Sequence, residues 1–398
     1  MVKLAARIST IKPSPTLAIT AKANALKAEG RDVISFGAGE PDFDTPDHIK
    51  MAAVKAIEKG FTKYTPVDGI VELKDAIINK LSRDNQLVYN RAEIVVSCGA
   101  KHTLYNLTQV LFQEGDEVII PSPYWVSYLD MVLLSGARPA ILKTGEGQGF
   151  KILPEQLEAA ITRNTKAIIM NSPSNPTGAV YTAHELAALA EVISGQEMIV
   201  ISDDIYEKII YDDRPFTNIA SLGEELRNRT VVVNGVSKAY SMTGWRIGYA
   251  AGPEEIIQAV TKLQSQNTSN PTSISQWAAV EALNGNQESV PEMVEEFRRR
   301  RNVIVEKLNA IPGITCTLPH GAFYVFPDVS SLFGSSYRGQ ALSNSSDIAA
   351  YLLEAANVAV IPGVDFGQDN HIRLSYATSL KNIEEGLKRI SSAVRGLS

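Results

Sequence analysis

Short apolar segments alternate with helix-like segments between about residues 93 and 252. Six of the apolar segments predict β-strands, at residues 94–97, 117–121, 166–171, 198–203, 230–234 and 246–250. Helix-like segments, such as residues 104–112 and 185–193, lie between several of these strands. Strands that alternate with helices are typical of a mostly parallel sheet covered by helices on both faces. Ligands of such sheets bind at the carboxyl ends of the strands, so the residues that follow each strand are the candidates for a binding site.

After residue 252 the pattern becomes helical and then mixed. Helices are predicted at 253–266, 272–283 and 290–311, followed by strands near 322–326 and 372–376 and an amphipathic helix at 380–394. The N-terminal segment is rich in proline and glycine, and it predicts no helix before Thr16. A chain of 398 residues is long enough for one large and one smaller domain.

Charge and cysteine content narrow the function classes. The net charge of −6 argues against nucleic acid as the main partner, since binding to phosphate backbones requires a basic surface. The arginine run 298–301 lies in a long amphipathic segment that also carries glutamates, so we expect a charged helix face there. Cys98 and Cys316 cannot form a disulfide framework. Neither is grouped with other metal-ligating residues in the sequence, so no metal site is predicted.

The sequence also predicts where the protein resides. No apolar run approaches the length needed to span a membrane, and residues 1–19 lack the apolar core of a signal peptide. We therefore expect a soluble, cytoplasmic protein with no membrane partner.

Two strand-end segments could hold parts of a ring-shaped, phosphorylated cofactor. Gly99, Ala100 and Lys101 follow the strand at 94–97 and begin a helix, where backbone N–H groups and the helix dipole make a phosphate site. Taken alone, a glycine at that position is usually just a turn. Trp125 follows the next strand and offers an aromatic plane, although a packed interfacial tryptophan fits that position equally well.

Two further segments offer polar side chains at strand ends. The turn at 171–178 presents the amide of Asn175, and a turn this stiff often serves only as a turn. Asp203, Asp204 and Tyr206 lie at the end of the strand at 198–203. A buried carboxylate that faces a pyridine nitrogen keeps it protonated, whereas a lone aspartate there is more often a helix cap. Adjacent strand residues point to opposite faces, so only one of the two aspartates can face a ring.

A lysine and an arginine follow the strand at 230–234. Lys238 can form a Schiff base with an aldehyde cofactor, and Arg246, eight residues later, can bind that cofactor's phosphate. A lysine taken alone is usually a solvated loop residue. Together, however, the five segments supply what pyridoxal phosphate requires: a lysine, an acid for the ring nitrogen, donors for the phenolic oxygen, an aromatic stack and a phosphate cup. The G-x-G-x-x-G sequence of dinucleotide sites and the P-loop sequence are missing.

The chain resembles the class I pyridoxal-phosphate aminotransferases of fold type I. It is most similar to the subgroup of bacterial aspartate aminotransferases that includes the thermophilic enzymes. The motifs SPSNPTGAVY, SDDIYE, SKAYSMTGWRIGY and HIRLSYA occur in order and at fitting separations, and the resemblance extends from Lys12 to Ala377. It implies an α/β, three-layer αβα fold with a large, mostly parallel sheet domain at 48–301. It also implies a smaller, discontinuous α+β domain formed by 1–47 and 302–398.

The resemblance assigns roles in the cofactor site. It implies that Lys238 is the Schiff-base lysine and moves the proton between the substrate Cα and the cofactor, and that Asp203 pairs with the pyridinium nitrogen. Tyr206 and Asn175 would donate to the ring oxygen. Trp125 would stack on the ring. The residues expected around the phosphate are Gly99, Ala100, Lys101, Ser237 and Arg246.

The resemblance also implies substrate contacts and a second subunit. Arg373 would bind the substrate α-carboxylate, because its planar fork pairs with a carboxylate through two hydrogen bonds. Tyr64 would reach the phosphate of the neighbouring subunit, which implies a homodimer with shared active sites. The further substrate contacts expected are Gly39 through its backbone, Trp125 and Asn175.

The predicted site for the substrate's distal carboxylate departs from the wider family. Some members place an arginine of the partner subunit there, and the matching loop at 265–270 contains none. The subgroup uses a serine, a threonine and a lysine instead, which correspond to Ser14, Thr16 and Lys101. A lysine is a point charge without fork geometry, so selectivity for short dicarboxylates is expected to be looser. Gly235 stands where other branches carry a phosphate-binding serine.

The resulting hypothesis is a pyridoxal-phosphate aminotransferase of amino-acid metabolism that converts L-aspartate and 2-oxoglutarate reversibly to oxaloacetate and L-glutamate by a ping-pong cycle. The first alternative is a broader acceptor range that includes prephenate or aromatic 2-oxo acids. A carbon–sulfur lyase is a more distant alternative. A regulatory scaffold would be expected to carry a DNA-binding domain, for which there is no room before Lys12, and to have lost Lys238, Asp203 or Arg373.

Overall fold

A seven-stranded sheet forms the centre of the larger part of the molecule. The computed structural model describes residues 2–13 and 15–397, without the side chains of 15–17. In spatial order the strands of the sheet are β2 (Ile94–Ser97), β8 (Gly248–Ala251), β7 (Thr230–Gly235), β6 (Ile199–Asp203), β5 (Thr165–Asn171), β3 (Glu117–Ser122) and β4 (Arg138–Lys143). Strand β8 is antiparallel to both of its neighbours, and all other neighbouring pairs are parallel. The predicted α/β class with a mostly parallel sheet is confirmed.

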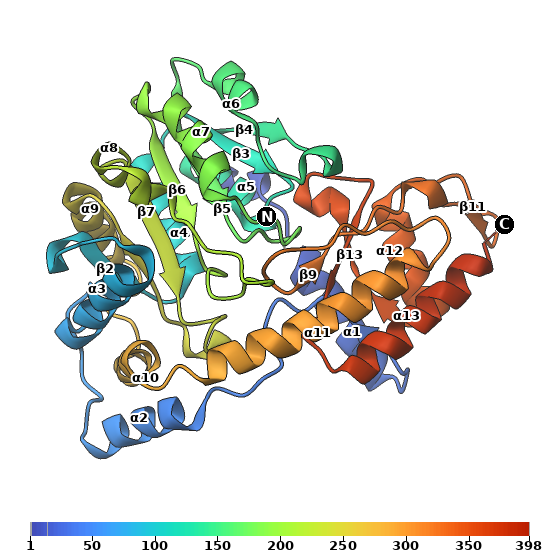
Figure 1. Cartoon of the computed structure of the whole chain (residues 1–398), viewed down its shortest axis with the longest axis horizontal. Helices are drawn as coiled ribbons and strands as arrows, with labels where there is room; N and C mark the ends of the chain where they lie inside the picture. The colour runs from blue at the N-terminus through green and yellow to red at the C-terminus, as the bar shows by residue number, and fades with distance from the viewer. Residues whose placement is uncertain (1, 14, 398) are drawn as a thin grey trace.

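Helices cover both faces of this sheet, so the larger part has three layers (Figure 1). Alternate strand residues pack on opposite faces: Ile169 and Val233 belong to one apolar cluster, whereas Ile168 and Val232 belong to others. One face is covered by α4 (Ala100–Leu111), α5 (Val126–Ser135) and α9 (Glu254–Gln264). The other face is covered by α2 (Asp47–Glu58), α3 (Val71–Asn85), α6 (Pro154–Ala160), α7 (Ala183–Ser194), α8 (Glu224–Arg227) and α10 (Ser273–Asn284).

Two strands differ from the prediction. The last predicted strand, at 246–250, begins only at Gly248, because Arg246 adopts a left-handed backbone with φ 58°. Strand β4 was not predicted, since it is an edge strand with no buried residue and with Pro139 near its start. An edge strand faces solvent on one side and lacks the apolar run that marks a buried strand.

The C-terminal part of the chain packs with the N-terminal segment. A three-stranded antiparallel sheet contains β13 (Ile361–Pro362), β14 (Ile372–Ser375) and β9 (Tyr324–Val325). Strand β1 (Ile34–Ser35) pairs in parallel with β12 (Val358–Ala359), and this pairing joins the N-terminal segment to the C-terminal part of the chain. The remaining elements are α1 (Pro15–Ala28), α11 (Ser289–Asn309), α12 (Ser345–Ala356), α13 (Leu380–Arg395) and the hairpin β10 (Ser336–Tyr337) and β11 (Gln340–Ala341). The domain boundaries at 47/48 and 301/302 stay a prediction.

Helix α11 extends from the larger part into the C-terminal part (Figure 1). The arginine run 298–301 of this helix is only partly the exposed charged face that the sequence predicts. Arg298 and Arg299 pair with glutamates one turn earlier, as expected. Arg300 and Arg301 are only 7% and 2% exposed, and they pair with Asp42 and Asp212 from other segments. Half of the run therefore belongs to the interior.

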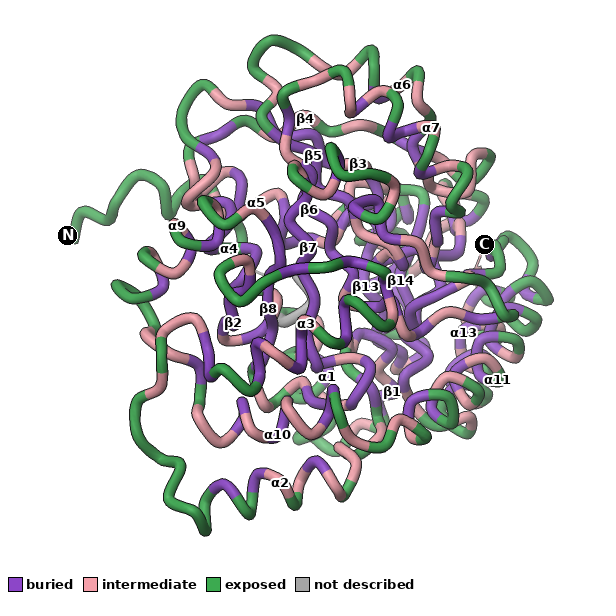
Figure 2. Tube along the Cα trace, turned by 60° about the vertical axis from the view of Figure 1, so that its left-hand side comes forward, coloured by how far each residue is buried: buried purple, intermediate pink, exposed green. Residues whose placement is uncertain are grey.

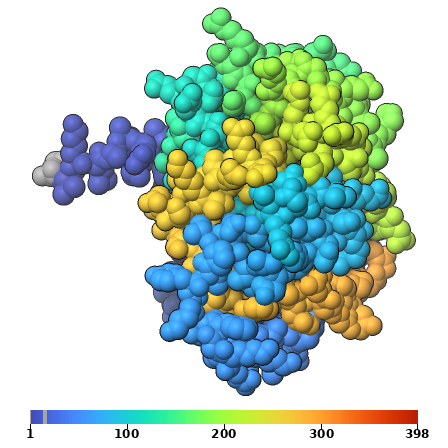
Figure 3. All heavy atoms as spheres, turned by 90° about the vertical axis from the view of Figure 1, so that its left-hand side faces the viewer, coloured from blue at the N-terminus to red at the C-terminus, as the bar shows by residue number. Residues whose placement is uncertain are grey.

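The N-terminal residues leave the body of the protein. Residues 2–10 are exposed and form an arm whose outer part projects from the surface in Figures 2 and 3 and whose inner part lies beside α5. The arm includes a 3₁₀ helix at Ala6–Thr10, which the expectation of no helix before Thr16 missed. None of the described helices combines the length and apolar character that crossing a membrane requires.

Candidate active site

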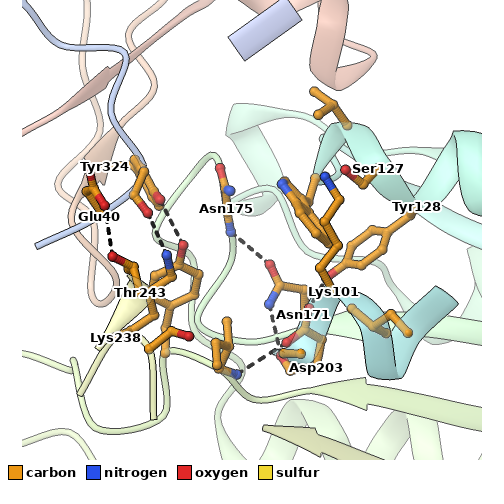
Figure 4. Close-up of a pocket in the computed structure, with 18 of the residues that line it drawn as sticks. Glu40, Lys101, Ser127, Tyr128, Asn171, Asn175, Asp203, Lys238, Thr243 and Tyr324 are labelled. Atoms are coloured by element: carbon orange, nitrogen blue, oxygen red, sulfur yellow. Dashed lines mark hydrogen bonds between the residues drawn. The ribbon is translucent and has the colours of Figure 1, made fainter. Parts of the chain in front are cut away.

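A cavity of about 410 Å³ lies at the carboxyl ends of the central strands (Figure 4). Segments that follow five strands contribute side chains to it, and the N-terminal segment and the C-terminal sheet close it from the other side. Most of the site residues predicted from the sequence line this cavity. They are Gly39, Ala100, Lys101, Trp125, Asn175, Asp203, Tyr206, Ser237, Lys238, Arg246 and Arg373.

Asp203 is the acid that faces the cavity. Its Oδ2 accepts a hydrogen bond from the hydroxyl of Tyr128 at 2.5 Å, and its Oδ1 accepts one from the backbone N–H of Ile205 at 3.3 Å. Burial raises the pKa of Asp203 to about 6, and the hydrogen bond from Tyr128 opposes that rise. Asp204 points away and accepts hydrogen bonds from Ser202 and Asn218, so the alternation of strand side chains separates the two acids.

Lys238 lies opposite, just beyond the end of β7. Its Nζ donates a hydrogen bond to the carbonyl of Gly39 at 2.5 Å. Burial lowers the pKa of Lys238 to about 8, while the carboxylate of Glu40 partly restores it. A lysine with a lowered pKa is neutral in a larger fraction of molecules near pH 7, and only the neutral amine can attack a carbonyl carbon.

One end of the cavity is built for an anion. Helix α4 begins at Ala100, so its first N–H groups have no partner within the helix. Strand β8 approaches this helix start so closely that a Cβ on Gly248 would overlap the backbone of Gly99 and Ala100. Gly99 has φ 90°, and a Cβ there would collide with the guanidinium of Arg246. Because neither glycine has a side chain, the guanidinium of Arg246 and the N-terminus of α4 can lie close together.

The guanidinium of Arg246 is held by two carbonyl groups. Its Nη1 donates to the carbonyl of Thr243 at 2.8 Å and its Nη2 donates to the carbonyl of Cys98 at 3.2 Å. These bonds orient the side chain without neutralising it, which suits a phosphate ligand.

Arg373 is a buried cation in the lining of the same cavity. The residue is 2% exposed, and it has no ion pair among the described residues. Nη1 donates to Asn175 Oδ1 at 3.0 Å and Nη2 donates to the carbonyl of Gly37 at 2.8 Å, while Nε has no hydrogen-bond partner among the described residues. A buried charge is costly unless it is paired. Arg373 is thus positioned to receive an anionic ligand.

Aromatic side chains complete the lining. Trp125 packs edge-on against Tyr128, with ring centres 5.3 Å apart, and the Nζ of Lys101 lies 5.2 Å from the Trp125 ring centre. The hydroxyl of Tyr206 is 2.8 Å from that of Tyr324. The Tyr324 ring also lies 4.5 Å from the Cζ of Arg373, so one tyrosine contacts two of the predicted site residues.

Of the other predicted residues, Gly99 and Tyr64 are not in the lining of this cavity. Tyr64 is 91% exposed and lies away from the lining. Ser14 and the side chain of Thr16 lie outside the described residues.

Several lining residues were missed by the sequence analysis. Tyr128 stands three positions after Trp125 at the start of α5, so helical spacing could have indicated it. Asn171, whose Nδ2 donates to the carbonyl of Asp203 at 2.8 Å, begins a turn that was already singled out. Tyr324 sits among apolar neighbours, and Glu40 reaches the hydroxyl of Thr243 at 2.8 Å across distant segments. No local signal marks these last contacts, which Figure 4 shows on the side of Lys238.

Comparison with known proteins identifies the family. The family described as aminotransferase class I and II matches residues 31–390 of this chain. The chain belongs to this family. It is 54% identical to the aspartate aminotransferase of Geobacillus stearothermophilus over 98% of both chains, and 52% identical to the aspartate/prephenate aminotransferase of Nitrosomonas europaea over 98% of this chain and 99% of that one. The crystal structure of the aspartate aminotransferase from Rhizobium meliloti superposes with a TM-score of 0.97 at 49% identity, covering 100% of both chains.

Class I and II aminotransferases of this group use pyridoxal phosphate, and this enzyme is a pyridoxal-phosphate-dependent aminotransferase. The cavity fits that cofactor. The anion site at Gly99 and Arg246 matches a phosphate, Lys238 is a partly buried amine of lowered pKa, and Asp203 is a buried acid on the same cavity. Arg373 adds to the same cavity a donor, Nε, that has no partner among the described residues.

Proposed function

We propose that the enzyme transfers the amino group of L-aspartate reversibly to 2-oxoglutarate, giving oxaloacetate and L-glutamate by a ping-pong cycle. The observation that carries this proposal is the cationic lining of the cavity. Arg246, Arg373 and Lys101 all line it, and none of them forms an ion pair among the described residues. Three cations correspond to one cofactor phosphate and the two carboxylates of a dicarboxylic substrate. The names of the relatives, including three aspartate aminotransferases at 52–54% identity, support the same substrate.

We assign Arg373 to the α-carboxylate and Lys101 to the distal carboxylate. Arg373 is held by Asn175 and Gly37, so its orientation is set before the substrate arrives. Lys101 has a lowered pKa, chiefly because of burial and further because of the positive charge of Arg246. The negative charge of a distal carboxylate beside Lys101 would offset the cost of burying the lysine's ammonium group, whereas a neutral substrate side chain would not.

The cofactor supplies an electron sink for the bonds at the substrate Cα. With the cofactor bound, Lys238 would act as the general base that takes the proton from Cα and would deliver a proton to C4′, and its lowered pKa makes a neutral amine accessible near neutral pH. In its ionised form Asp203 would keep the ring nitrogen of the cofactor protonated, and the hydrogen bond from Tyr128 favours that ionised form. Tyr206 and Asn175 would donate to the ring oxygen, Trp125 would stack on the ring, and Ser237 would contribute to the phosphate site; all four line the cavity.

A half-reaction screen tests the substrate assignment. The holoenzyme is mixed with single amino acids, and the change in cofactor absorbance is followed without an acceptor. We expect aspartate and glutamate to react and Lys238→Ala to be inactive with both. Discrimination of aspartate over tyrosine by less than about tenfold, or ~1.4 kcal/mol in transition-state binding, would favour the broader acceptor range instead.

A second candidate acceptor is prephenate. Two observations favour it: relatives at 52–53% identity are named aspartate/prephenate aminotransferases, and Lys101 lacks the fork geometry that restricts an arginine site. Prephenate is also a dicarboxylate, so the same cations can serve it. Measuring kcat/KM for prephenate beside 2-oxoglutarate decides the order of preference.

We further propose that the enzyme is a homodimer with shared active sites. Support comes from surface residues that a monomer would leave in water: the projecting N-terminal arm, the exposed Tyr64, and an apolar stripe on α2 formed by Met51, Val54 and Ile57, which are 40–55% exposed. Tyr64 would then contribute to the partner's phosphate site. Mixing the inactive variants Tyr64→Ala and Lys238→Ala should restore activity, because one site of the mixed dimer has both native residues. No recovery in a mixture shown to exchange subunits would contradict shared sites.

A cytoplasmic location also remains our proposal. The two cysteines, Cys98 and Cys316, are free thiols, as is usual in a reducing compartment. Cell fractionation followed by an activity assay tests it.

A further inference from the structure

Glu146, Asp328 and His371 form a cluster outside the cofactor cavity. Each offers one ligand atom, and these atoms lie within 4.8 Å of one another. Asp328 and His371 stand opposite each other in an antiparallel bridge, so their side chains share one face of the C-terminal sheet. Glu146 comes from a 3₁₀ helix (Glu146–Gln148) that follows β4 of the central sheet. None of the three lines the cofactor cavity.

His371 is an unsatisfied polar group in the interior. It is 3% exposed, and neither Nδ1 nor Nε2 has a hydrogen-bond partner among the described residues. Its ring stacks on Phe326, with ring centres 4.8 Å apart and an interplanar angle of 9°, and Phe150 packs against it at 5.4 Å and 80°. Packing therefore fixes the ring while its nitrogens remain without a protein partner. A buried polar group in this state is rare in folded proteins and indicates a missing ligand or water.

The two carboxylates are oriented by their own neighbours. Asp328 Oδ1 accepts a hydrogen bond from the backbone N–H of Ser330 at 2.6 Å. Glu146 Oε1 accepts one from the hydroxyl of Thr317. Groups of this kind behind a carboxylate hold metal ligands in place.

We propose that Glu146, Asp328 and His371 bind a divalent first-row transition cation of the Zn²⁺ type. The site would supply one imidazole nitrogen and two carboxylate oxygens, with water in the remaining positions. Imidazole and carboxylate together suit such cations better than Mg²⁺ or Ca²⁺, which prefer oxygen ligands alone. Two carboxylates and a neutral imidazole also balance a charge of +2.

The alternative to a bound metal is protonation of His371, because a charged imidazolium would form ion pairs with the two carboxylates. Burial lowers the pKa of His371, and this outweighs the opposing effect of the Asp328 and Glu146 carboxylates. A neutral imidazole near pH 7 is the form that binds a metal. The site would also join a segment of the central sheet part to the C-terminal sheet, so binding should stabilise the folded protein.

Equilibrium dialysis of the chelator-treated holoenzyme against ZnCl₂ at pH 7.5 tests the proposal. We expect one Zn²⁺ per chain and a higher midpoint of thermal unfolding with Zn²⁺. Glu146→Gln should weaken Zn²⁺ binding at least about tenfold. This is the deciding variant, because Glu146 is exposed and its change leaves the packing of His371 against Phe326 intact. Asp328→Asn should weaken binding similarly, and Glu255→Gln, a matched change at an exposed position of α9, should not.

Binding should also weaken in acid, because protonation of the imidazole competes with the metal. The proposal is overturned if the native holoenzyme binds no Zn²⁺, or if Glu146→Gln binds it with native affinity. The second result would place the metal elsewhere, for example at the thiol of Cys98. Neither result bears on the aminotransferase assignment, which rests on other residues.

Discussion

The hydroxyl of Tyr128 donates a hydrogen bond of 2.5 Å to the carboxylate of Asp203. Tyr128 is fully buried in the first turn of α5, and it reaches the end of β6 across the floor of the cavity. The bond opposes the effect of burial, which raises the pKa of Asp203 to about 6. Tyr128 thus positions and tunes an acid that must be ionised when the cofactor is bound.

Tyr128→Phe should raise the pKa of Asp203 and move the acidic limb of the pH–activity profile to higher pH. Hydrogen bonds to charged groups contribute about 1.5–3 kcal/mol, so we expect kcat/KM to fall roughly ten- to hundredfold on that limb. The profile should be recorded from pH 5 to 9 beside Tyr124→Phe, a buried tyrosine that does not line the cavity. An unshifted acidic limb would show that Tyr128 does not control the ionisation of Asp203.

Arg373→Lys should raise KM for both the amino donor and the acceptor. Lysine keeps the charge but loses the fork that would hold a carboxylate while donating to Asn175 and Gly37. We expect a loss of about 2 kcal/mol, or about thirtyfold in KM, with a smaller effect on kcat. Steady-state kinetics measure this, and Arg338→Lys at an exposed ion pair serves as the control. Native KM values in Arg373→Lys would remove Arg373 from carboxylate binding.

Gly248→Ala should weaken cofactor binding. The new Cβ would overlap the backbone of Gly99 and Ala100, so the start of α4 must move away from the phosphate site. Overpacking of this kind costs about 1–3 kcal/mol, and we expect cofactor affinity to fall at least about tenfold. Absorbance titration of the apoenzyme measures the affinity. Gly244→Ala is the matched control, because nothing lies within 4 Å of the Cβ it would add.

Lys80→Met should destabilise the fold more than most single substitutions. Lys80 and Glu207 form a buried ion pair, with exposures of 2% and 7%, and Asn85 bonds to both. Removing one charge leaves the other buried and unpaired, which costs about 3–5 kcal/mol. The free energy of unfolding in urea should recover largely in Lys80→Met combined with Glu207→Leu. A double variant as unstable as the single one would show that the charge is not the cause.

Lys238→Met should stabilise the apoenzyme at neutral pH. Burial lowers the pKa of Lys238 from 10.5 to about 8, so between these values the folded state binds fewer protons than the unfolded state. Stability of the native apoenzyme therefore rises with pH through this window, and below pH 8 the full cost of burying the charged amine is present. The variant should be more stable at pH 7 by up to roughly 3 kcal/mol, and this gain should vanish above pH 10.5. Denaturant unfolding at several pH values measures it, and a gain independent of pH would contradict the titration.

Much of the site could be predicted because its residues follow buried strands. The apolar runs at β5, β6 and β7 locate three strand ends, and parallel pairing brings the side chains after them to one edge of the sheet. Asn175, Asp203 and Lys238 converge on the cavity for this reason. The periodicity failed at β4, where no residue is buried, and at Arg246, whose left-handed backbone delays β8.

The sequence by itself determined the α/β class, the mostly parallel sheet and the kind of chemistry, because strand burial and strand-end residues are local properties of the chain. The tertiary structure alone decided which partners tune that chemistry. Tyr128 bonds to Asp203 across 75 residues, Tyr206 to Tyr324 across 118, and Lys238 to Gly39 across 199. The cluster of Glu146, Asp328 and His371 likewise combines three distant segments. Such contacts arise from how the layers pack, and packing is a property of the whole fold that no local pattern contains.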